Sequence, residues 1–243
     1  MGNQTSIEWT DSTWNPWQGC HHVSPGCEQC YMFSEKRRYG QDPDVVVRSK
    51  PTTFNLPLRL RQRQRVFTCS WSDFFIKEAD PWREEAWEII RNTPHLTYQI
   101  LTKRIERAAE RLPWGEGEPW PNVWLGVSAE DQPTARRRIP LLCSIRAAVR
   151  FVSFEPLLGP IELISASGTL WPYLHWAIIG GESGSGARPC NLAWIRSLKE
   201  QCQEWKVPVF CKQGGSSNRC AHDSKGGCWE CMPADLKIRE YPR

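Results

Sequence analysis

The chain has 243 residues, of which 24% are charged, and its formal net charge is only +4. This length suits one large α/β domain or two small ones, and neither a secretory signal nor an apolar run of about 18 residues is present. Eleven cysteines without an export signal argue against a disulfide framework and favour metal binding. We therefore expect a cytoplasmic protein with no membrane span.

Three cysteines lie close together near the N-terminus. They are Cys20, Cys27 and Cys30, with six and two residues between them. Gly and Pro residues punctuate this stretch, so it can form a tight loop that carries three thiolates. Thiolates bind zinc or an iron–sulfur cluster, and three of them leave one iron of a four-iron cluster open to a small molecule. The spacing therefore predicts a metal centre.

The segment after this loop is strongly basic. Residues 31–38 are typical of the start of a helix, and residues 40–57 of a loop. Residues 31–66 hold nine Lys or Arg against three acidic residues, a net charge of +6. Such a segment either binds an anionic partner such as nucleic acid or forms a solvated basic face. The basic residues are Lys36, Arg37, Arg38, Arg48, Lys50, Arg59, Arg61, Arg63 and Arg65.

Most of the fourteen tryptophans are expected in the core or at its rim, and a few could stack on bases.

Short apolar runs that favour β-strands then alternate with helical patterns. The runs lie at 66–69, 97–101, 123–127, 149–153, 176–179 and 207–210. Asp80 and Pro81 are typical of a helix start, an apolar stripe covers 105–112, and Asn191 can cap a third helix.

This alternation predicts βα units and a parallel sheet. With a short strand near residues 14–18, we expect six or seven βα units over residues 1–213, forming a partial TIM-type barrel. Residues 214–243, rich in Gly, Ser and Cys, are expected to form a C-terminal extension that is metal-stapled or flexible.

A charged side chain follows every one of the six apolar runs. Because ligands of parallel α/β folds bind at the carboxyl ends of the strands, these residues are candidates for binding a cofactor. The charged candidates are Asp73, Lys103, Glu130, Glu155, Glu182 and Lys212, joined by Ser70 and Ser72. Gly180 and Gly181 let the backbone approach a ligand closely, and Glu182 could accept hydrogen bonds from an ammonium group; a β-turn with a capping acid is the alternative. Arg188 could pair with a carboxylate or phosphate, or cap a strand end.

Several of these segments together resemble a known family. The N-terminal motif Trp-Asn-Pro-Trp-x-Gly-Cys-x6-Cys-x2-Cys-Tyr and the segments 101–104, 122–128, 154–160 and 180–184 are similar to a phage-associated, radical S-adenosylmethionine (SAM)-like three-cysteine family that is largely uncharacterised. The likeness extends in order from about Thr5 to Gly215. The x6 gap is wider than the common C-x3-C-x2-C spacing of radical SAM enzymes.

The resemblance implies a four-iron cluster on Cys20, Cys27 and Cys30, with SAM bound at the open iron. An electron donor would reduce the cluster, and cleavage of SAM would give a 5′-deoxyadenosyl radical that abstracts hydrogen from substrate. Either Gly180, Gly181 and Glu182 or Ser70, Ser72 and Asp73 would contact SAM.

A second cysteine group lies at the C-terminus. Cys211, Cys220, Cys228 and Cys231 could hold structural zinc or an auxiliary cluster, with His222 as a substitute ligand if Cys211 is buried in its strand. The alternative is a set of scattered reduced thiols. The other four cysteines, Cys69, Cys143, Cys190 and Cys202, are expected to be buried thiols.

These observations favour a radical SAM enzyme that modifies or repairs a nucleic acid or nucleotide. The alternative is a non-catalytic zinc or iron–sulfur protein that binds nucleic acid. Zinc hydrolysis is disfavoured because three thiolates weaken the metal as a Lewis acid. The sequence leaves open whether a partner protein supplies part of the site.

Overall fold

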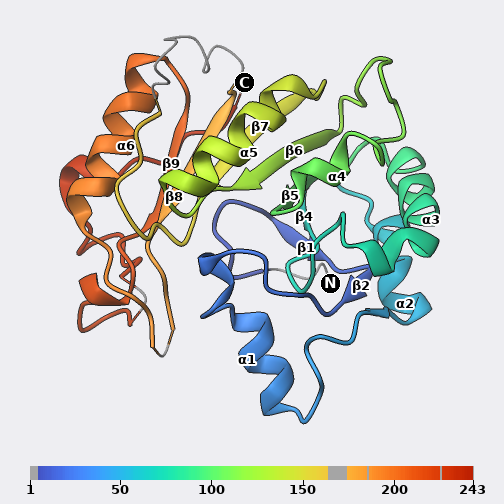
Figure 1. Cartoon of the computed structure of the whole chain (residues 1–243), viewed down its shortest axis with the longest axis horizontal. Helices are drawn as coiled ribbons and strands as arrows, with labels where there is room; N and C mark the ends of the chain where they lie inside the picture. The colour runs from blue at the N-terminus through green and yellow to red at the C-terminus, as the bar shows by residue number, and fades with distance from the viewer. Residues whose placement is uncertain (1–4, 164–173, 185, 225, 243) are drawn as a thin grey trace. The chain divides into compact units, whose positions relative to one another are not determined.

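The computed structural model describes residues 5–163, 174–184, 186–224 and 226–242 (Figure 1). The chain divides into two compact units. Unit 1 comprises residues 1–23, 30–126 and 145–148, and unit 2 comprises residues 24–29, 127–144 and 149–243. The predicted extension at 214–243 thus belongs to unit 2.

The fold is α/β, with a seven-stranded parallel half-barrel sheet, as the alternation of strands and helices predicts. Its strands follow the order β1-β4-β5-β6-β7-β8-β9. Their bounds are β1 Ser12–Trp14, β4 Arg65–Thr68, β5 Thr97–Thr102, β6 Val123–Ser128, β7 Val149–Phe154, β8 Trp176–Gly180 and β9 Val209–Gln213. Every residue of β8 is buried, which is typical of a central strand of a parallel sheet that is covered on both faces.

Unit 1 contains β1, β4 and β5, which pair in parallel through Ser12 with Val66 and Val66 with Tyr98. A separate antiparallel pair joins β2 (Trp17–Gln18) to β3 (Val47–Arg48). The helices of unit 1 are α1 Tyr31–Arg38, α2 Pro51–Phe54, α3 Asp80–Arg91 and α4 Ile105–Ala108, with the 3-10 turns η2 Leu56–Arg59 and η3 Lys77–Ala79. The core is rich in aromatic side chains: the rings of Trp14 and Tyr98 meet edge to face, as do those of Phe74 and Trp87.

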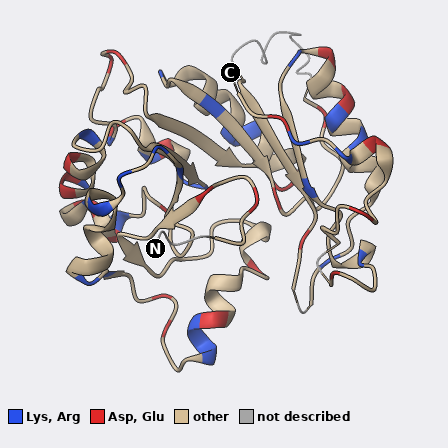
Figure 2. Cartoon of the chain, turned by 180° about the vertical axis from the view of Figure 1, so that it is seen from behind, with Lys and Arg blue, Asp and Glu red and all other residues tan. Residues whose placement is uncertain are grey.

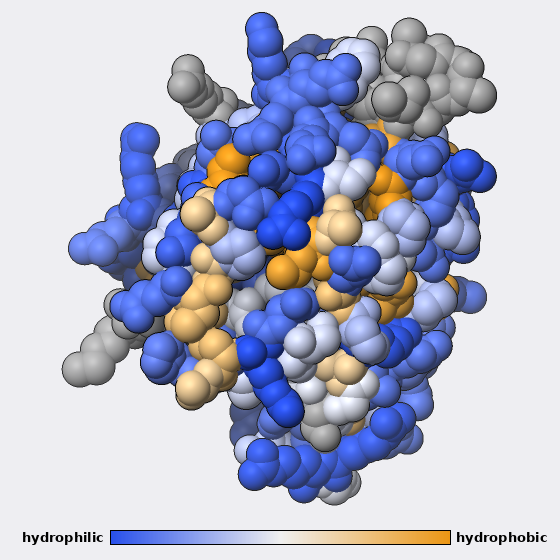
Figure 3. Space-filling view, turned by 90° about the vertical axis from the view of Figure 1, so that its left-hand side faces the viewer, coloured by the Kyte–Doolittle hydropathy of each residue, from blue (hydrophilic) through white to orange (hydrophobic). Residues whose placement is uncertain are grey.

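Unit 2 contains β7, β8 and β9, which pair in parallel through Phe151 with Trp176 and Ala177 with Val209. Its helices are α5 Gln132–Ser144 and α6 Leu192–Glu204, with the 3-10 turns η1 Pro25–Cys27, η4 Ser216–Asn218 and η5 Ala234–Leu236. Asn191 caps α6 as predicted, because its side-chain oxygen accepts the backbone N–H of Ala193 at 2.9 Å. Figure 3 shows that mainly hydrophilic side chains cover the face of the molecule on the α6 side of Figure 1.

Five local features differ from the sequence prediction. Asp80 lies within the first turn of α3 rather than capping it, because its carboxylate accepts the guanidinium groups of Arg83 and Arg107 instead. The segment 40–57 contains α2, the apolar stripe of 105–112 is helical only to Ala108, and α5 was not expected. The last strand begins at Val209, one residue after a proline that has no N–H for the ladder.

The tryptophans are mostly structural, as expected. Among the residues that the structure describes, six tryptophans are buried, namely Trp9, Trp14, Trp17, Trp87, Trp114 and Trp176. Trp205 and Trp229 are 42% and 41% exposed. Among the helices that the structure describes, none has the length and apolar character needed to cross a membrane.

Candidate functional site

Four metal-ligating side chains converge near the C-terminus, all within unit 2. One ligand atom from each of Cys220, His222, Cys228 and Cys231 lies within 4.8 Å of the other three. His222 Nδ1 is 3.5 Å from Cys231 Sγ and 3.9 Å from Cys228 Sγ. These four residues could hold a metal ion.

Short turns bring these four side chains together. The backbones of Cys220 and Asp223 hydrogen-bond to each other at 3.2 and 3.4 Å, so His222 lies inside a tight turn. The carboxylate of Asp223 then accepts the N–H of Gly227, the residue before Cys228. Gly226 has a φ of +72°, and a Cβ there would lie 2.3 Å from the carbonyl oxygen of Gly215. Only glycine suits this position, so the loop between the ligands is built for close approach.

Cys211, one of the four cysteines expected at this site, is not part of the group. It is 2% exposed within β9, and burial raises the pKa of its thiol to about 12. His222 stands in its place, which is the substitution that the sequence left open.

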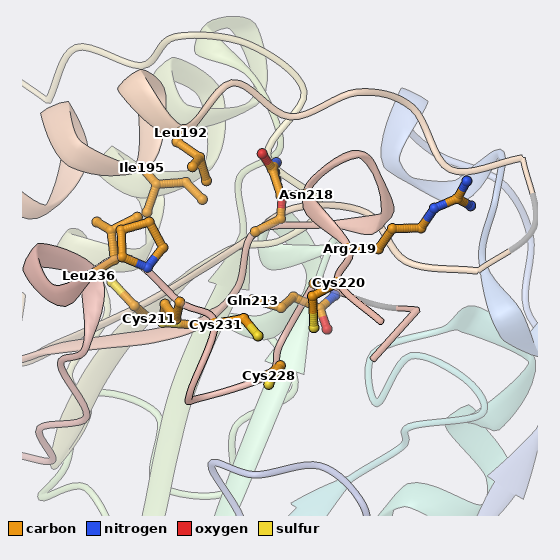
Figure 4. Close-up of a pocket in the computed structure, with 14 residues that line it drawn as sticks. Leu192, Ile195, Cys211, Gln213, Asn218, Arg219, Cys220, Cys228, Cys231 and Leu236 are labelled. Atoms are coloured by element: carbon orange, nitrogen blue, oxygen red, sulfur yellow. Dashed lines mark hydrogen bonds between the residues drawn. The ribbon is translucent and has the colours of Figure 1, made fainter. Parts of the chain in front are cut away.

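The metal-binding group borders a cavity of about 180 Å³ (Figure 4). Leu192 and Ile195 of α6 form an apolar wall, and Cys220, Cys228 and Cys231 line another part. In Figure 4 the sulfur atoms of these cysteines gather below Asn218, beside Gln213 at the end of β9.

The three N-terminal cysteines belong to different units. Cys20 and Cys30 lie in unit 1, where Cys30 directly precedes α1, and Cys27 lies in η1 of unit 2. The metal centre expected on these cysteines stays a prediction. Each one nevertheless has surroundings that can be described within its own unit.

The sulfur of Cys20 contacts a partly buried cation. Arg104, just after β5, donates from Nη1 to Cys20 Sγ at 3.5 Å and from Nη2 to the carbonyl of His21 at 3.0 Å. Burial lowers the pKa of Arg104, but the negative charges of Asp73 and Cys20 raise it above its ordinary value. A guanidinium beside sulfur favours the thiolate, which is the metal-binding form.

Asp73 connects the ends of β4 and β5. Its carboxylate accepts the backbone N–H of Lys103 at 2.9 Å and the hydroxyl of Thr102 at 2.7 Å, and it pairs with Arg104 at 3.2 Å. Its side chain is 5% exposed. In this structure Asp73 therefore positions Arg104.

Ser70 and Ser72 hold the start of the cysteine loop in unit 1. Ser72 Oγ donates to the carbonyl of Gly19 at 2.6 Å, and Ser70 Oγ accepts from the amide of Asn15 at 3.0 Å. The hydroxyl of Tyr31 donates to the carbonyl of Ser70. These residues thus hold Asn15 and Gly19, which precede Cys20, and Tyr31, which follows Cys30.

Cys27 is 5% exposed and lies beside a buried ion pair of unit 2. Ser24 Oγ is 3.9 Å from Cys27 Sγ and donates to Glu130 Oε1 at 2.8 Å. Glu130 pairs with Arg138 at 2.9 Å, and both side chains are fully buried. A Cβ on Gly26 would lie 2.3 Å from the Glu130 side chain, so the cysteine-bearing turn requires glycine there.

Glu182 is engaged by an arginine. Arg188 donates from Nε and Nη2 to the two carboxylate oxygens of Glu182 at 2.9 and 2.6 Å, and it also contacts Glu28 and the carbonyl of Pro25 at 2.9 Å. The hydrogen bonds with Glu182 raise the pKa of Arg188. Arg188 thus joins the end of β8 to the turn that carries Cys27.

The glycines before Glu182 have a packing role. A Cβ on Gly181 would lie 2.7 Å from the carbonyl oxygen of Gly214 and 2.8 Å from Cys190, so two backbone segments meet at this residue. Beside them, Lys212 Nζ and Glu155 Oε1 form an ion pair at 2.5 Å between the ends of β9 and β7. Unit 2 thus places Gly180, Glu155, Glu182 and Lys212 at the carboxyl ends of its strands, as predicted.

Sequence reasoning missed Arg104 and Arg138. Arg104 follows the Leu-Thr-Lys segment, where only Lys103 was singled out, and Arg138 lies in α5, which was not expected. An arginine at an apolar position of a helical pattern, such as Arg138 beside Ala135, Ile139 and Leu142, was the available signal. Of the four remaining cysteines, Cys69, Cys190 and Cys202 are buried as expected, whereas Cys143 is only half-buried.

Some of the basic residues of segment 31–66 form ion pairs or are buried within the fold. Arg48 pairs with Glu85, Arg65 pairs with Asp11, and Lys36 is buried. Arg59, Arg61 and Arg63 are exposed, as are Arg37, Arg38 and Lys50. Figure 2 shows the basic residues at the end of α1.

The chain matches a family model described as "Protein of unknown function (DUF5131)" over residues 4–233. The chain belongs to this family. The matched span includes the N-terminal and the C-terminal cysteine groups. No curated protein and no solved structure matches the chain.

Proposed function

We propose that the chain is an iron–sulfur radical SAM enzyme that modifies or repairs a nucleic acid or nucleotide. Cys20, Cys27 and Cys30 would hold a four-iron cluster, leaving one iron for SAM. Once reduced by a donor, such a cluster supplies the electron that cleaves SAM to a 5′-deoxyadenosyl radical. The parallel half-barrel sheet supports this class, since ligands bind at the carboxyl ends of parallel strands.

The contact between Arg104 and the sulfur of Cys20 carries the proposal. The thiol follows β1 and β2 closely, and a partly buried guanidinium that donates to its sulfur favours the thiolate needed for iron. A structural thiol buried against apolar side chains would instead have a raised pKa, as Cys202 has. Cys20 therefore has the surroundings of a ligand rather than those of a core residue.

The residues around this contact fit the same role. Asp73 neutralises and orients Arg104, while Ser72 fixes the carbonyl of Gly19 directly before Cys20. In unit 2, Glu130 and Arg188 each contact the turn that carries Cys27. These side chains hold the proposed ligands in place, which is the usual task of groups around a metal ligand.

The proposed substrate class depends on the exposed part of the basic segment. Arg59, Arg61 and Arg63 alternate along the chain with their side chains in solvent, so they are available to phosphates. We propose that they contribute to binding of a nucleic acid.

The test of the radical chemistry is production of 5′-deoxyadenosine. The protein is reconstituted anaerobically with iron and sulfide, reduced with dithionite and given SAM. We expect 5′-deoxyadenosine from the wild type and from Cys143→Ala, and none from Cys27→Ala. Absence of the product from wild type that carries about four irons would refute the assignment.

Arg104 has its own test, because it is argued to act through Cys20. Arg104→Lys should retain part of the iron and Arg104→Met should retain less, with both variants compared by circular dichroism for folding. Equal iron content and equal cluster absorption in Arg104→Met and wild type would show that the guanidinium does not support the ligand.

Nucleic-acid binding is tested with the triple variant Arg59→Ala, Arg61→Ala, Arg63→Ala. We expect weaker binding of labelled single-stranded and double-stranded oligonucleotides and a smaller slope of log K against log salt, by roughly 0.7–0.9 per lost phosphate contact. Arg91→Ala, an exposed arginine of α3, is the control. Unchanged affinity in the triple variant would remove the support for this substrate class.

A further inference from the structure

We propose that Cys220, His222, Cys228 and Cys231 bind a single structural Zn²⁺, and that this ion fixes the segment that supports the loop after β8. The inference is independent of the radical chemistry and concerns only unit 2.

The spacing of the donors fits one tetrahedral ion. Zinc binds thiolates at about 2.3 Å and imidazole nitrogen at about 2.0–2.1 Å, so a tetrahedron puts S and N roughly 3.6 Å apart and two S atoms roughly 3.8 Å apart. His222 Nδ1 lies 3.5 and 3.9 Å from two of the sulfurs, and all four donors fall within 4.8 Å of one another. The side chains are thus arranged around one common centre.

The same spacing argues against an auxiliary iron–sulfur cluster. Each ligand of a four-iron cluster binds a different iron, so the ligand atoms lie farther apart than those that share one ion. Three thiolates and one imidazole are a standard donor set for structural zinc, and four protein ligands leave no open position for catalysis.

The proposed zinc centre is joined by hydrogen bonds to the loop after β8. Cys220 lies two residues beyond η4, whose Ser216 donates its backbone N–H to the carbonyl of Glu182 at 2.9 Å. Asn218 donates from Nδ2 to the carbonyls of Cys190 and Gly214 at 2.9 and 2.7 Å. On the other side, Gly214 donates its N–H to the carbonyl of Gly226 at 2.8 Å.

These contacts define what the ion would do. The segment from Gly214 to Met232 has few apolar side chains with which to form a core of its own, so ligation supplies its cross-link. Through Ser216 and Asn218, that cross-link would hold the backbone of Glu182 and Cys190. We assign the zinc a positioning role for the Gly-Gly-Glu segment.

Metal content of the full chain tests the site. Protein purified without added iron is dialysed, and zinc per chain is measured by mass spectrometry of the elements. We expect about one zinc in wild type, in Cys27→Ala and in the half-buried control Cys143→Ser, and a loss of at least about tenfold in Cys228→Ser and His222→Ala. His222→Cys should retain zinc, because four thiolates also suit the ion.

A titration of the wild type with Co²⁺ tests the same site without relying on a variant that could fail to fold. Zinc is removed from wild type with a chelator, and Co²⁺ is titrated back. Saturation at about one equivalent, with tetrahedral ligand-field bands and thiolate charge-transfer absorption, supports the site. Zinc content unchanged in folded Cys228→Ser, or acid-labile sulfide that disappears with Cys228, overturns it.

Hydrogen exchange tests the positioning role separately. Removal of zinc should speed exchange by roughly tenfold or more at Ser216, Asn218 and Cys190, and leave the amides of η2 in unit 1 unchanged. If exchange at Ser216 and Cys190 is the same with and without zinc, the ion binds but does not position this loop.

Discussion

Replacing Arg138 by methionine should destabilise the protein strongly. Arg138 and Glu130 are both fully buried, and Nη1 of Arg138 donates to Glu130 at 2.9 Å and to the carbonyl of Ser128 at 2.8 Å. The variant keeps the volume of the side chain but leaves the carboxylate without its cation. Removal of one partner of a buried pair costs about 3–5 kcal/mol.

A double variant shows how much of the loss comes from leaving one buried charge without its partner. Nε and Nη2 of Arg138 have no hydrogen-bond partner among the described residues, so the desolvation of the guanidinium is only partly compensated. Glu130→Gln combined with Arg138→Met removes both charges, and we expect it to recover more than half of the loss.

Thermal and urea unfolding measure these changes. For a chain of this size, about 1 kcal/mol corresponds to roughly 2–4 °C in Tm, so Arg138→Met should lower Tm by about 6–20 °C. Arg146→Met is the control: Arg146 is 48% exposed and pairs with the exposed Glu118, and its loss should cost less than about 1 kcal/mol. A loss in Arg138→Met as small as that in Arg146→Met would refute the reasoning.

Three further predictions concern single residues. Gly26→Ala should destabilise the protein or displace the turn before Cys27, because its Cβ would overlap Glu130, whereas Gly159→Ala, where a Cβ meets open space, should be neutral by thermal unfolding. Asp73→Asn should cost about 2–4 kcal/mol in urea unfolding, since the carboxylate accepts from Phe75, Thr102, Lys103 and Arg104; a cost below about 1 kcal/mol would contradict this role. Burial and the charge of Arg150 lower the pKa of His175 below 6.5, so the folded state binds fewer protons than the unfolded state. The contribution of neutral His175 to the free energy of unfolding is therefore present above the unfolded pKa and is lost as the pH falls toward the folded pKa. We expect His175→Asn to lose less stability than the wild type between about pH 7 and pH 5, as measured by urea unfolding.

Much of the fold could be predicted because its strands are short apolar runs with polar ends. The run 176–179 became the fully buried β8, and Asn191 capped α6 by a local hydrogen bond. The helix α5 was missed because buried Arg138 and Pro140 interrupt its apolar pattern. A charged residue enters a core only where a partner meets it, and the partner of Arg138, Glu130, lies eight residues away in the connection before α5.

For the candidate sites too, the sequence pattern predicted the residue types but not the contacts between distant residues. The spacing of Cys220, Cys228 and Cys231 predicted a metal group, but the choice between Cys211 and His222 depended on the burial of β9. The contact between Arg104 and Cys20 joins residues 84 apart in the sequence, so no local pattern could reveal it. Glu182 was expected to accept from a ligand, and its partner Arg188 lies only six residues away.

The central claim is that two distinct metal centres reside on the two cysteine groups. It is tested most directly by counting iron and zinc in the same anaerobically reconstituted samples. We predict about four irons and one zinc per chain, with iron lost in Cys27→Ala and zinc lost in Cys228→Ser, each without the other. Zinc in place of iron on Cys20, Cys27 and Cys30, in protein prepared with and without air, would contradict the account.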